Sequence, residues 1–263
     1  MKKSILLISS LLLFSVKLLA QNYGNLTYSE AINISGKQRM LSQKIAKTYL
    51  LKLTDLKLGS EEYKKATQTF NENLNLLIDN SSNSQESTKL SIEEEKKQWV
   101  KFLNVLMLNP TNDINKIILI ANGLLNNCKD LVSKIESEAG GTSNKPIAQE
   151  KTVNLSGKQR MLSQRTALYY VAASLSTSED KKNQYIGEVK RILELLKSSN
   201  DKLVQNPLNT SDINSYLSKV RTKINMIESS KIDSLSIDLT ELMKTCNEIT
   251  STYNTITGIY ASI

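Results

Sequence analysis

Residues 33–43 read NISGKQRMLSQ, and residues 154–164 read NLSGKQRMLSQ. Ten of the eleven positions are identical, and the remaining one exchanges Ile34 for Leu155, at an offset of 121 residues. Self-similarity at a fixed period is typical of duplicated or repeated architectures. We therefore predict two copies of one unit, near residues 21–142 and 143–263. The stretch AGGTSNKP at residues 139–146 has the composition of a linker between them.

Each unit is predicted to contain four amphipathic helices, because apolar residues recur at helical spacing between short segments rich in Asn, Ser and Pro. The predicted helices of the first unit lie near residues 27–57, 60–80, 89–108 and 112–138. Those of the second lie near residues 147–176, 179–205, 211–229 and 232–259. Four such helices joined by short loops indicate an up-and-down antiparallel four-helix bundle, and hence an all-α fold.

The composition excludes several classes of protein. The chain has 263 residues, of which 40% are hydrophobic but only 5% aromatic, with nine Gly and three Pro, which weighs against β-sandwiches. It contains no His, so His-based catalytic triads and His-ligated zinc or haem are ruled out. The sequence offers no Cys or Ser beside an evident catalytic base. We therefore predict that the protein is not an enzyme and needs no metal or cofactor.

The first twenty residues are predicted to be a secretory signal peptide. Two Lys follow Met1, residues 4–16 are mostly apolar, and Ala20 offers a small residue for cleavage. Residues 4–16 are short for a bilayer span, although an uncleaved anchor is the alternative. We therefore expect a periplasmic or otherwise exported chain that does not span a membrane once the signal is removed.

The charge of the exported chain suits an anionic ligand. Three of the 34 basic residues lie in residues 1–20, which leaves 31 basic and 26 acidic residues and a net charge of +5. This mild excess is compatible with binding an anion. Because the basic residues are scattered among acidic ones, we expect no nucleic-acid partner.

The repeated segment presents two faces on a helical wheel. Ile34, Leu41 and Ile45 share one face, which should pack into the bundle core. Gly36 and Arg39 share another with Gln43 (Gly157, Arg160 and Gln164 in the second copy). A helical Gly costs about 1 kcal/mol relative to Ala, so its presence in both copies suggests that a backbone or a ligand approaches closely.

Convergence of Arg39 and Arg160 would create an anion site. If the two first helices pair about a pseudo-twofold axis, the two guanidinium groups meet and repel unless an anion lies between them. The alternative is structural, since duplication guarantees some identity and an Arg on a helix usually marks a solvated face. The strong divergence of the rest of the two units favours a functional segment, but both interpretations stay open.

Cys128 and Cys246 fall in similar places late in the two units. Two Cys are too few for a disulfide-dense scaffold. A buried apolar position in a helix is the interpretation we favour, because free Cys is often buried. A disulfide between the two equivalent helices is the other interpretation, since export would permit it.

The pattern Asn-x-x-Gly-x-x-Arg-Met-x-Ser, at residues 33–42 and again at 154–163, resembles the signature helix of a known family. The family is the type IV pili methyl-accepting chemotaxis transducer N-terminal (PilJ-type) domain, which is similar to the periplasmic sensor domain of NarX-type nitrate/nitrite histidine kinases. Trp99 and the two late Cys also fit it, although the second unit lacks an equivalent Trp.

The resemblance implies four-helix bundles that pair through their first helices, with nitrate held between the two motif arginines and near the motif glycines. For this chain it implies an all-α fold of two tandem up-and-down antiparallel four-helix bundles. It places the ligand contacts at Arg39 and Arg160, beside Gly36 and Gly157. Weaker candidates, which follow from the helical wheel, are Asn33, Asn154, Gln43 and Gln164.

The chain differs from sensors of this type, which carry flanking transmembrane helices and a cytoplasmic output domain. Here we expect both half-sites in one exported chain. Two functions follow. The first is a sensor-like protein, related to type IV pili chemotaxis, that binds a nitrate- or nitrite-like oxyanion at the pseudo-twofold interface. The second is a ligand-free helical interaction module that docks on a membrane receptor, signalling protein or pilus-related partner.

Overall fold

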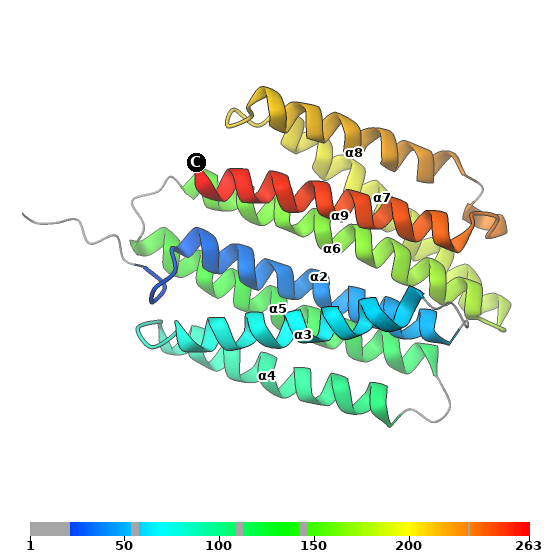
Figure 1. The fold of residues 1–263 in the computed structure, drawn as a ribbon, viewed down its shortest axis with the longest axis horizontal. Coiled ribbons are helices and arrows are strands. Elements are labelled where there is room, and N and C mark those ends of the chain that lie inside the picture. Colours follow the sequence, from blue (N-terminus) through cyan, green and yellow to red (C-terminus); the bar gives the residue numbers. More distant parts are fainter. Residues whose placement is uncertain (1–21, 54–57, 109–112, 143–146, 231) are drawn as a thin grey trace, which may run out of the picture.

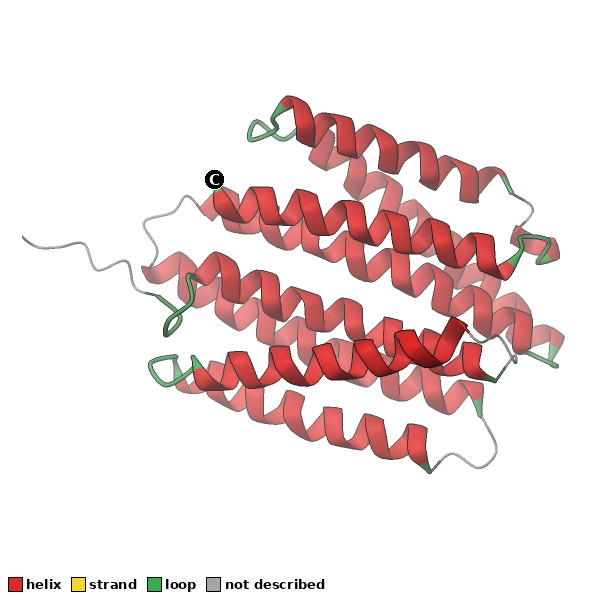
Figure 2. Ribbon diagram, in the orientation of Figure 1, coloured by secondary structure: helices red, strands yellow, loops and turns green. Residues whose placement is uncertain are grey.

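The computed structural model describes residues 22–53, 58–108, 113–142, 147–230 and 232–263. These residues form eight α-helices and one short 3-10 helix, and no strand is named among them (Figures 1 and 2). The predicted all-α class is therefore confirmed. The predicted signal peptide at residues 1–20 and the second half of the predicted linker, residues 143–146, lie outside the described residues. The first half of that linker, residues 139–142, is instead the last turn of a helix.

The eight helices occur close to where the sequence predicts them. They are α2 (Tyr28–Lys52), α3 (Leu58–Asp79), α4 (Glu86–Met107), α5 (Ile114–Thr142), α6 (Ile147–Leu175), α7 (Glu179–Val204), α8 (Ser211–Ser229) and α9 (Leu239–Ser262). The 3-10 helix η1 spans Ile232–Ser234.

Local capping decides the helix boundaries. Before α2, the Thr27 side chain accepts a hydrogen bond from the Glu30 amide and the Glu30 carboxylate accepts one from the Thr27 amide, which is a capping box. Helix α9 was predicted to begin near residue 232 but begins at Leu239, because Asp238 caps it by accepting a hydrogen bond from the Glu241 amide.

Helices α2 and α6, which carry the repeated segments, pack against each other along the middle of the molecule (Figure 1). Helix α2 also contacts α3 and α5, and α4 packs on α5. Helix α6 contacts α7 and α9, and α8 packs on both of these. As a result, the two copies of the motif face each other at the centre of the fold.

The interior is apolar on both sides of the α2–α6 contact. Phe70 stacks on Trp99 with ring centroids 4.0 Å apart, and the Trp99 indole donates a hydrogen bond to Asn71 Oδ1 at 2.6 Å. Leu41 is buried as the helical wheel predicts. Ile34 and Leu155 are only half-buried, because they pack at the edge of the core instead of inside it.

Both cysteines are free and fully buried, Cys128 in α5 and Cys246 in α9. Burial raises the pKa of the Cys246 thiol to about 12, so it is protonated at neutral pH. Cys128 and Cys246 are therefore buried packing residues, and they do not form a disulfide with each other.

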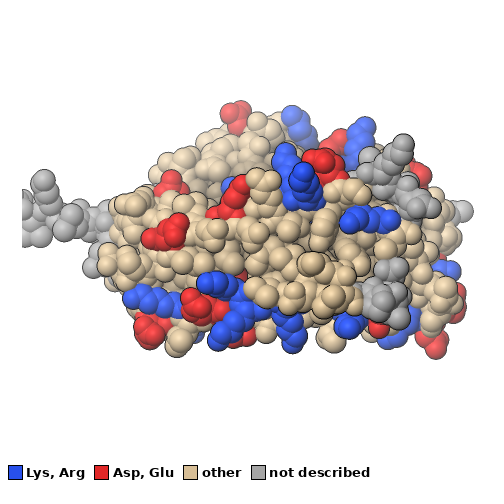
Figure 3. Space-filling view, turned by 60° about the horizontal axis from the view of Figure 1, so that its bottom comes forward, with Lys and Arg blue, Asp and Glu red and all other residues tan. Residues whose placement is uncertain are grey.

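The surface is mixed in charge. On the face shown in Figure 3, Lys and Arg side chains alternate with Asp and Glu instead of forming one large patch of a single sign. Within the described ranges, none of the helices is both long enough and apolar enough to cross a membrane.

A buried carboxyl group makes the stability of the fold depend on pH. Glu95 in α4 is fully buried, and burial raises its pKa from 4.5 to about 8, with Cys128 and Gln38 beside it lowering the pKa by less. Between pH 4.5 and 8 the folded state therefore holds one more proton than the unfolded state. The free energy of unfolding should fall as pH rises through this window, by up to about 1.4 kcal/mol per pH unit from this group.

We expect Glu95→Gln to remove this dependence. The free energy of unfolding of the variant minus that of the unsubstituted protein should increase from pH 5 to pH 8 and stay constant above pH 8. The reason is that the amide stays neutral, whereas the buried carboxyl group must lose its proton. Urea unfolding at pH 5, 6.5 and 8 measures the effect. Glu93→Gln, at an exposed position on the same helix, is the matched control. A difference between Glu95→Gln and the unsubstituted protein that stays constant with pH would contradict the prediction.

Candidate functional site

The side chains of Arg39 and Arg160 meet where α2 and α6 cross. Within each helix the motif Gly and Arg are three residues apart, so they lie on one face, and in both copies this face is turned toward the other helix. Arg39 is 6% exposed and Arg160 is 0% exposed. The two arginines therefore do not lie on a solvated helix face, which was the alternative interpretation of the motif.

The motif glycines make room for the guanidinium groups. A Cβ atom added at Gly36 would lie 3.2 Å from Nη2 of Arg39 and 3.2 Å from Nη2 of Arg160. A Cβ atom added at Gly157 would lie 2.9 Å from Arg160 Nη2 and 3.6 Å from Arg39 Nη2. The close approach that the helical glycines predict is thus made by the two guanidinium groups, which share one small space.

Arg160 is fixed by neutral acceptors. Its Nη1 donates to Asn33 Oδ1 at 2.8 Å and to Asn254 Oδ1 at 3.1 Å. Its Nη2 donates to the Asn33 carbonyl at 3.3 Å, and its Nε donates to the Gly157 carbonyl at 3.3 Å. Every nitrogen of this guanidinium group therefore has a partner, and none of these partners carries a negative charge.

Arg39 is held much more loosely. Its Nη2 donates to the Asn154 carbonyl at 3.5 Å, which mirrors the contact of Arg160 with the Asn33 carbonyl. Its Nε is buried and has no hydrogen-bond partner in the described part of the chain. The pseudo-symmetric pair is therefore unequal, and Arg39 has donor capacity that the protein does not use.

The electrostatic balance at this pair is unfavourable without an additional anion. Burial lowers the pKa of Arg39 to about 10, although Cys128 and Glu136 act against the shift. Burial and the charge of Arg39 lower the pKa of Arg160 to about 9. Within the described ranges no carboxylate forms an ion pair with either arginine. An unpaired charge is expensive to bury, and two converging guanidinium groups offer planar arrays of N–H donors that suit an oxyanion.

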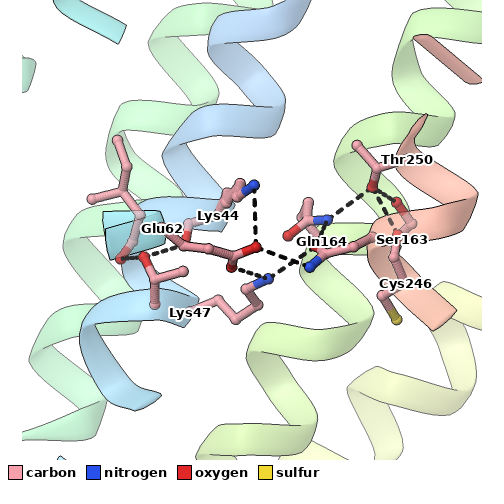
Figure 4. Close-up of polar contacts among 10 residues, drawn as sticks. Lys44, Lys47, Glu62, Ser163, Gln164, Cys246 and Thr250 are labelled. Atoms are coloured by element: carbon pink, nitrogen blue, oxygen red, sulfur yellow. Dashed lines mark hydrogen bonds and ion pairs between the residues drawn. The ribbon is translucent and has the colours of Figure 1, made fainter. Parts of the chain in front are cut away.

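Lys47, another buried cation, has an acidic partner, as buried charges usually do. Lys47 in α2 is fully buried, and its Nζ lies 3.6 Å from Glu62 Oε2 (Figure 4). Burial lowers the pKa of Lys47 to about 8, and Glu62 acts in the opposite direction. Lys47 is thus paired with an acid, whereas Arg39 and Arg160 form no ion pair with any of the residues that the structure describes.

The motif asparagines lie at the arginine pair, and the motif glutamines bond elsewhere. Asn33 and Asn154 are half-buried and each offers its carbonyl to the arginine of the other helix. Gln43 Nε2 donates to the Ala121 carbonyl at 3.2 Å, which ties α2 to α5. Gln164 Nε2 donates to Asn247 Oδ1 at 3.0 Å and to Thr250 Oγ1 at 2.8 Å, which ties α6 to α9 (Figure 4). A role for the two glutamines in ligand binding stays a prediction.

Two residues near the arginines were not predicted from the sequence. Asn254 in α9 accepts a hydrogen bond from Arg160, and Glu136 in α5 accepts one from Asn154 Nδ2 at 2.8 Å. Both lie outside the repeated motif, so no signal within the motif points to them. Their positions depend on how α5 and α9 pack on the central helix pair.

The chain was compared with models of known protein families. Residues 24–104 match the model of the type IV pili methyl-accepting chemotaxis transducer N-terminal domain, and this part of the chain contains α2, α3 and most of α4. The match covers less than half of the chain and indicates a helical segment similar to this domain of chemotaxis transducers. Searches of curated proteins and of solved structures found no match to the chain.

Proposed function

We propose that the chain is an exported sensor-like protein that binds a nitrate- or nitrite-like oxyanion between Arg39 and Arg160. In this proposal residues 21–142 and 143–263 are two tandem four-helix bundles that pair through α2 and α6. Residues 1–20 are a signal peptide that directs the chain to the periplasm or another exported location. The match of residues 24–104 to a chemotaxis-transducer domain supports a sensory role and a signalling or receptor protein as partner.

The observation that carries the proposal is the unpaired charge of the two arginines. Both guanidinium groups are buried, their Nη2 atoms lie equally close to one point beside Gly36, and no acid neutralises them within the described residues. A small planar anion at this point would accept hydrogen bonds from both groups and remove their repulsion. Arg39 would supply the donors that have no protein partner.

Calorimetric titration tests the proposal directly. We expect sodium nitrate or sodium nitrite to give saturable binding with one anion per chain at millimolar or lower concentration, measured at constant ionic strength against sodium chloride. Tetrahedral sulfate should bind more weakly, because the donors around the two glycines suit a planar ligand. Absence of binding heat and of any ligand-dependent rise in melting temperature at millimolar nitrate would refute the proposal.

A second candidate function is a ligand-free interaction module. It is favoured by Arg160, whose hydrogen bonds to Asn33, Asn254 and Gly157 already join α6 to α2 and α9. In that case the repeated face serves helix pairing alone. Removal of either arginine would then destabilise the fold, whereas an anion site predicts opposite effects at the two positions, as argued in the Discussion.

A further inference from the structure

A groove of about 610 Å³ lies beside the central helix pair, between α5, α6 and α7. Arg39 of α2 also lines it, so the groove reaches the loosely held arginine of the candidate site. Pockets of several hundred cubic ångströms are typical of sites for small organic molecules. A nitrate ion would fill only a small part of this volume.

Positive charge dominates the polar lining of the groove. Six cationic side chains line it, against one carboxylate, Glu136, which already accepts a hydrogen bond from Asn154. The cations are Arg39, Lys129, Lys151, Lys158, Arg165 and Arg191. Burial lowers the pKa of Lys129, and the charges of Arg165, Lys158, Arg39 and Arg191 lower it further.

Among the described residues, only Arg191 of these six cations forms an ion pair with an acid. Arg191 is paired with Glu188 at 2.7 Å. Arg165 donates to Asn122 Oδ1 at 2.9 Å and to the Tyr169 hydroxyl at 3.0 Å, both of which are neutral acceptors. No ion pair joins Lys129 or Lys158 to an acid within the part of the chain that the structure describes. The groove is therefore attractive to an anion, independently of the arginine pair.

The other walls of the groove are apolar. Leu155 of α6 and Leu195 of α7 line it with accessible apolar surface, whereas Leu162 and Ile192, which also border it, are 3% and 0% exposed. Leu195 is 37% exposed although it is a large hydrophobic residue, and Leu155 is half-buried. Apolar surface next to uncompensated cations fits a ligand that carries both a negative head and an apolar body.

We propose that this groove binds a small organic anion with an apolar body, such as a medium-chain carboxylate. Lys129, Lys158 and Arg165 hold the anionic head, and the body lies on Leu155 and Leu195. The site adjoins the proposed oxyanion site at Arg39 and does not depend on its occupation. An extended polyanion such as a nucleic acid suits it less, because the groove is short and the charges elsewhere on the surface are mixed.

Titration of the full-length chain with sodium octanoate tests the assignment. We expect saturable binding of one octanoate per chain below its micelle-forming concentration. Acetate lacks the apolar body and octan-1-ol lacks the charge, so both should bind at least tenfold more weakly. Binding of octan-1-ol as tight as that of octanoate would show a non-specific apolar surface and would overturn the proposal.

Matched charge reversals locate the site. Lys129→Glu/Lys158→Glu should weaken octanoate binding at least tenfold. Lys65→Glu/Lys101→Glu changes the net charge equally at exposed positions on α3 and α4 and should leave the affinity within twofold. Leu195→Gln should weaken octanoate binding several-fold without changing that of acetate, and its partial exposure makes the substitution tolerable for folding.

The outcomes for the two proposed sites are separable. Octanoate binding that is absent, or equal in both double variants, overturns the groove assignment whatever nitrate does. Nitrate binding that persists in Lys129→Glu/Lys158→Glu while octanoate binding is lost shows two distinct sites. Octanoate binding without nitrate binding supports the groove and rejects the oxyanion site between the arginines.

Discussion

Replacing Arg39 with Met is expected to abolish nitrate binding and, without ligand, to raise the free energy of unfolding by about 1–2 kcal/mol. The guanidinium group is 6% exposed, has no acidic partner in the described ranges, and makes one hydrogen bond at 3.5 Å. Met has a similar length and no charge, so the substitution removes a desolvation penalty and the repulsion of Arg160 while keeping most of the packing. Stability and ligand binding should therefore change in opposite directions.

Urea unfolding with and without nitrate measures both effects in one experiment. Arg221→Met is the matched control, because this arginine pairs with Asp201 on the outer helices α7 and α8, away from the central pair. The control should bind nitrate normally and change stability by less than about 1 kcal/mol. An Arg39→Met variant that is less stable than the unsubstituted protein would count against a buried, uncompensated charge at this position.

Replacing Arg160 with Met should abolish nitrate binding and lower the free energy of unfolding by about 1–3 kcal/mol. This arginine differs from Arg39 because four hydrogen bonds tie it to α2, α9 and its own helix. Its removal leaves the side-chain oxygen of the half-buried Asn33 without this donor, whereas Asn254 is exposed and its side-chain oxygen can bond to water instead. A buried acceptor that loses its partner bears its full desolvation cost.

The comparison of the two arginine variants is the decisive measurement. Arg160→Met/Asn33→Leu removes the donor together with the half-buried acceptor that Arg160→Met strands, so it should recover part of the stability lost in Arg160→Met without restoring nitrate binding. The calorimetric titration and urea unfolding described above provide both readouts. Equal stability changes in Arg39→Met and Arg160→Met would contradict the unequal roles that the hydrogen bonds assign to the pair.

Apolar spacing along the chain predicted the all-helical fold, and the repeated motif raised the approach of the two arginines as one of two interpretations. The offset of 121 residues placed Arg39 and Arg160 at equivalent positions, and the glycine one turn earlier in each copy indicated close contact. The predicted helix boundaries were less accurate where a capping side chain sets the observed boundary. Asp238 starts α9 later than the apolar periodicity suggests, and α5 continues through Gly140 and Gly141 to Thr142.

The inequality of the two arginines could not be predicted from the motif. Both copies have the same Asn, Gly, Arg and Gln, so the sequence pattern treats them as equivalent. The difference comes from α9, which brings Asn254 to Arg160, and from α5, which places Glu136 beside Asn154. These contacts depend on tertiary packing between segments that have diverged, and no helical wheel of α2 or α6 contains them.

The packing of α2 against α6 within one polypeptide has a consequence for mass action. A site between two separate subunits is lost on dilution below their dissociation constant, so its apparent affinity depends on protein concentration. Here the two halves are covalently joined and their effective concentration is fixed by the chain. Any ligand held between α2 and α6 should therefore bind with the same affinity at nanomolar and micromolar protein, and with a stoichiometry of one per polypeptide.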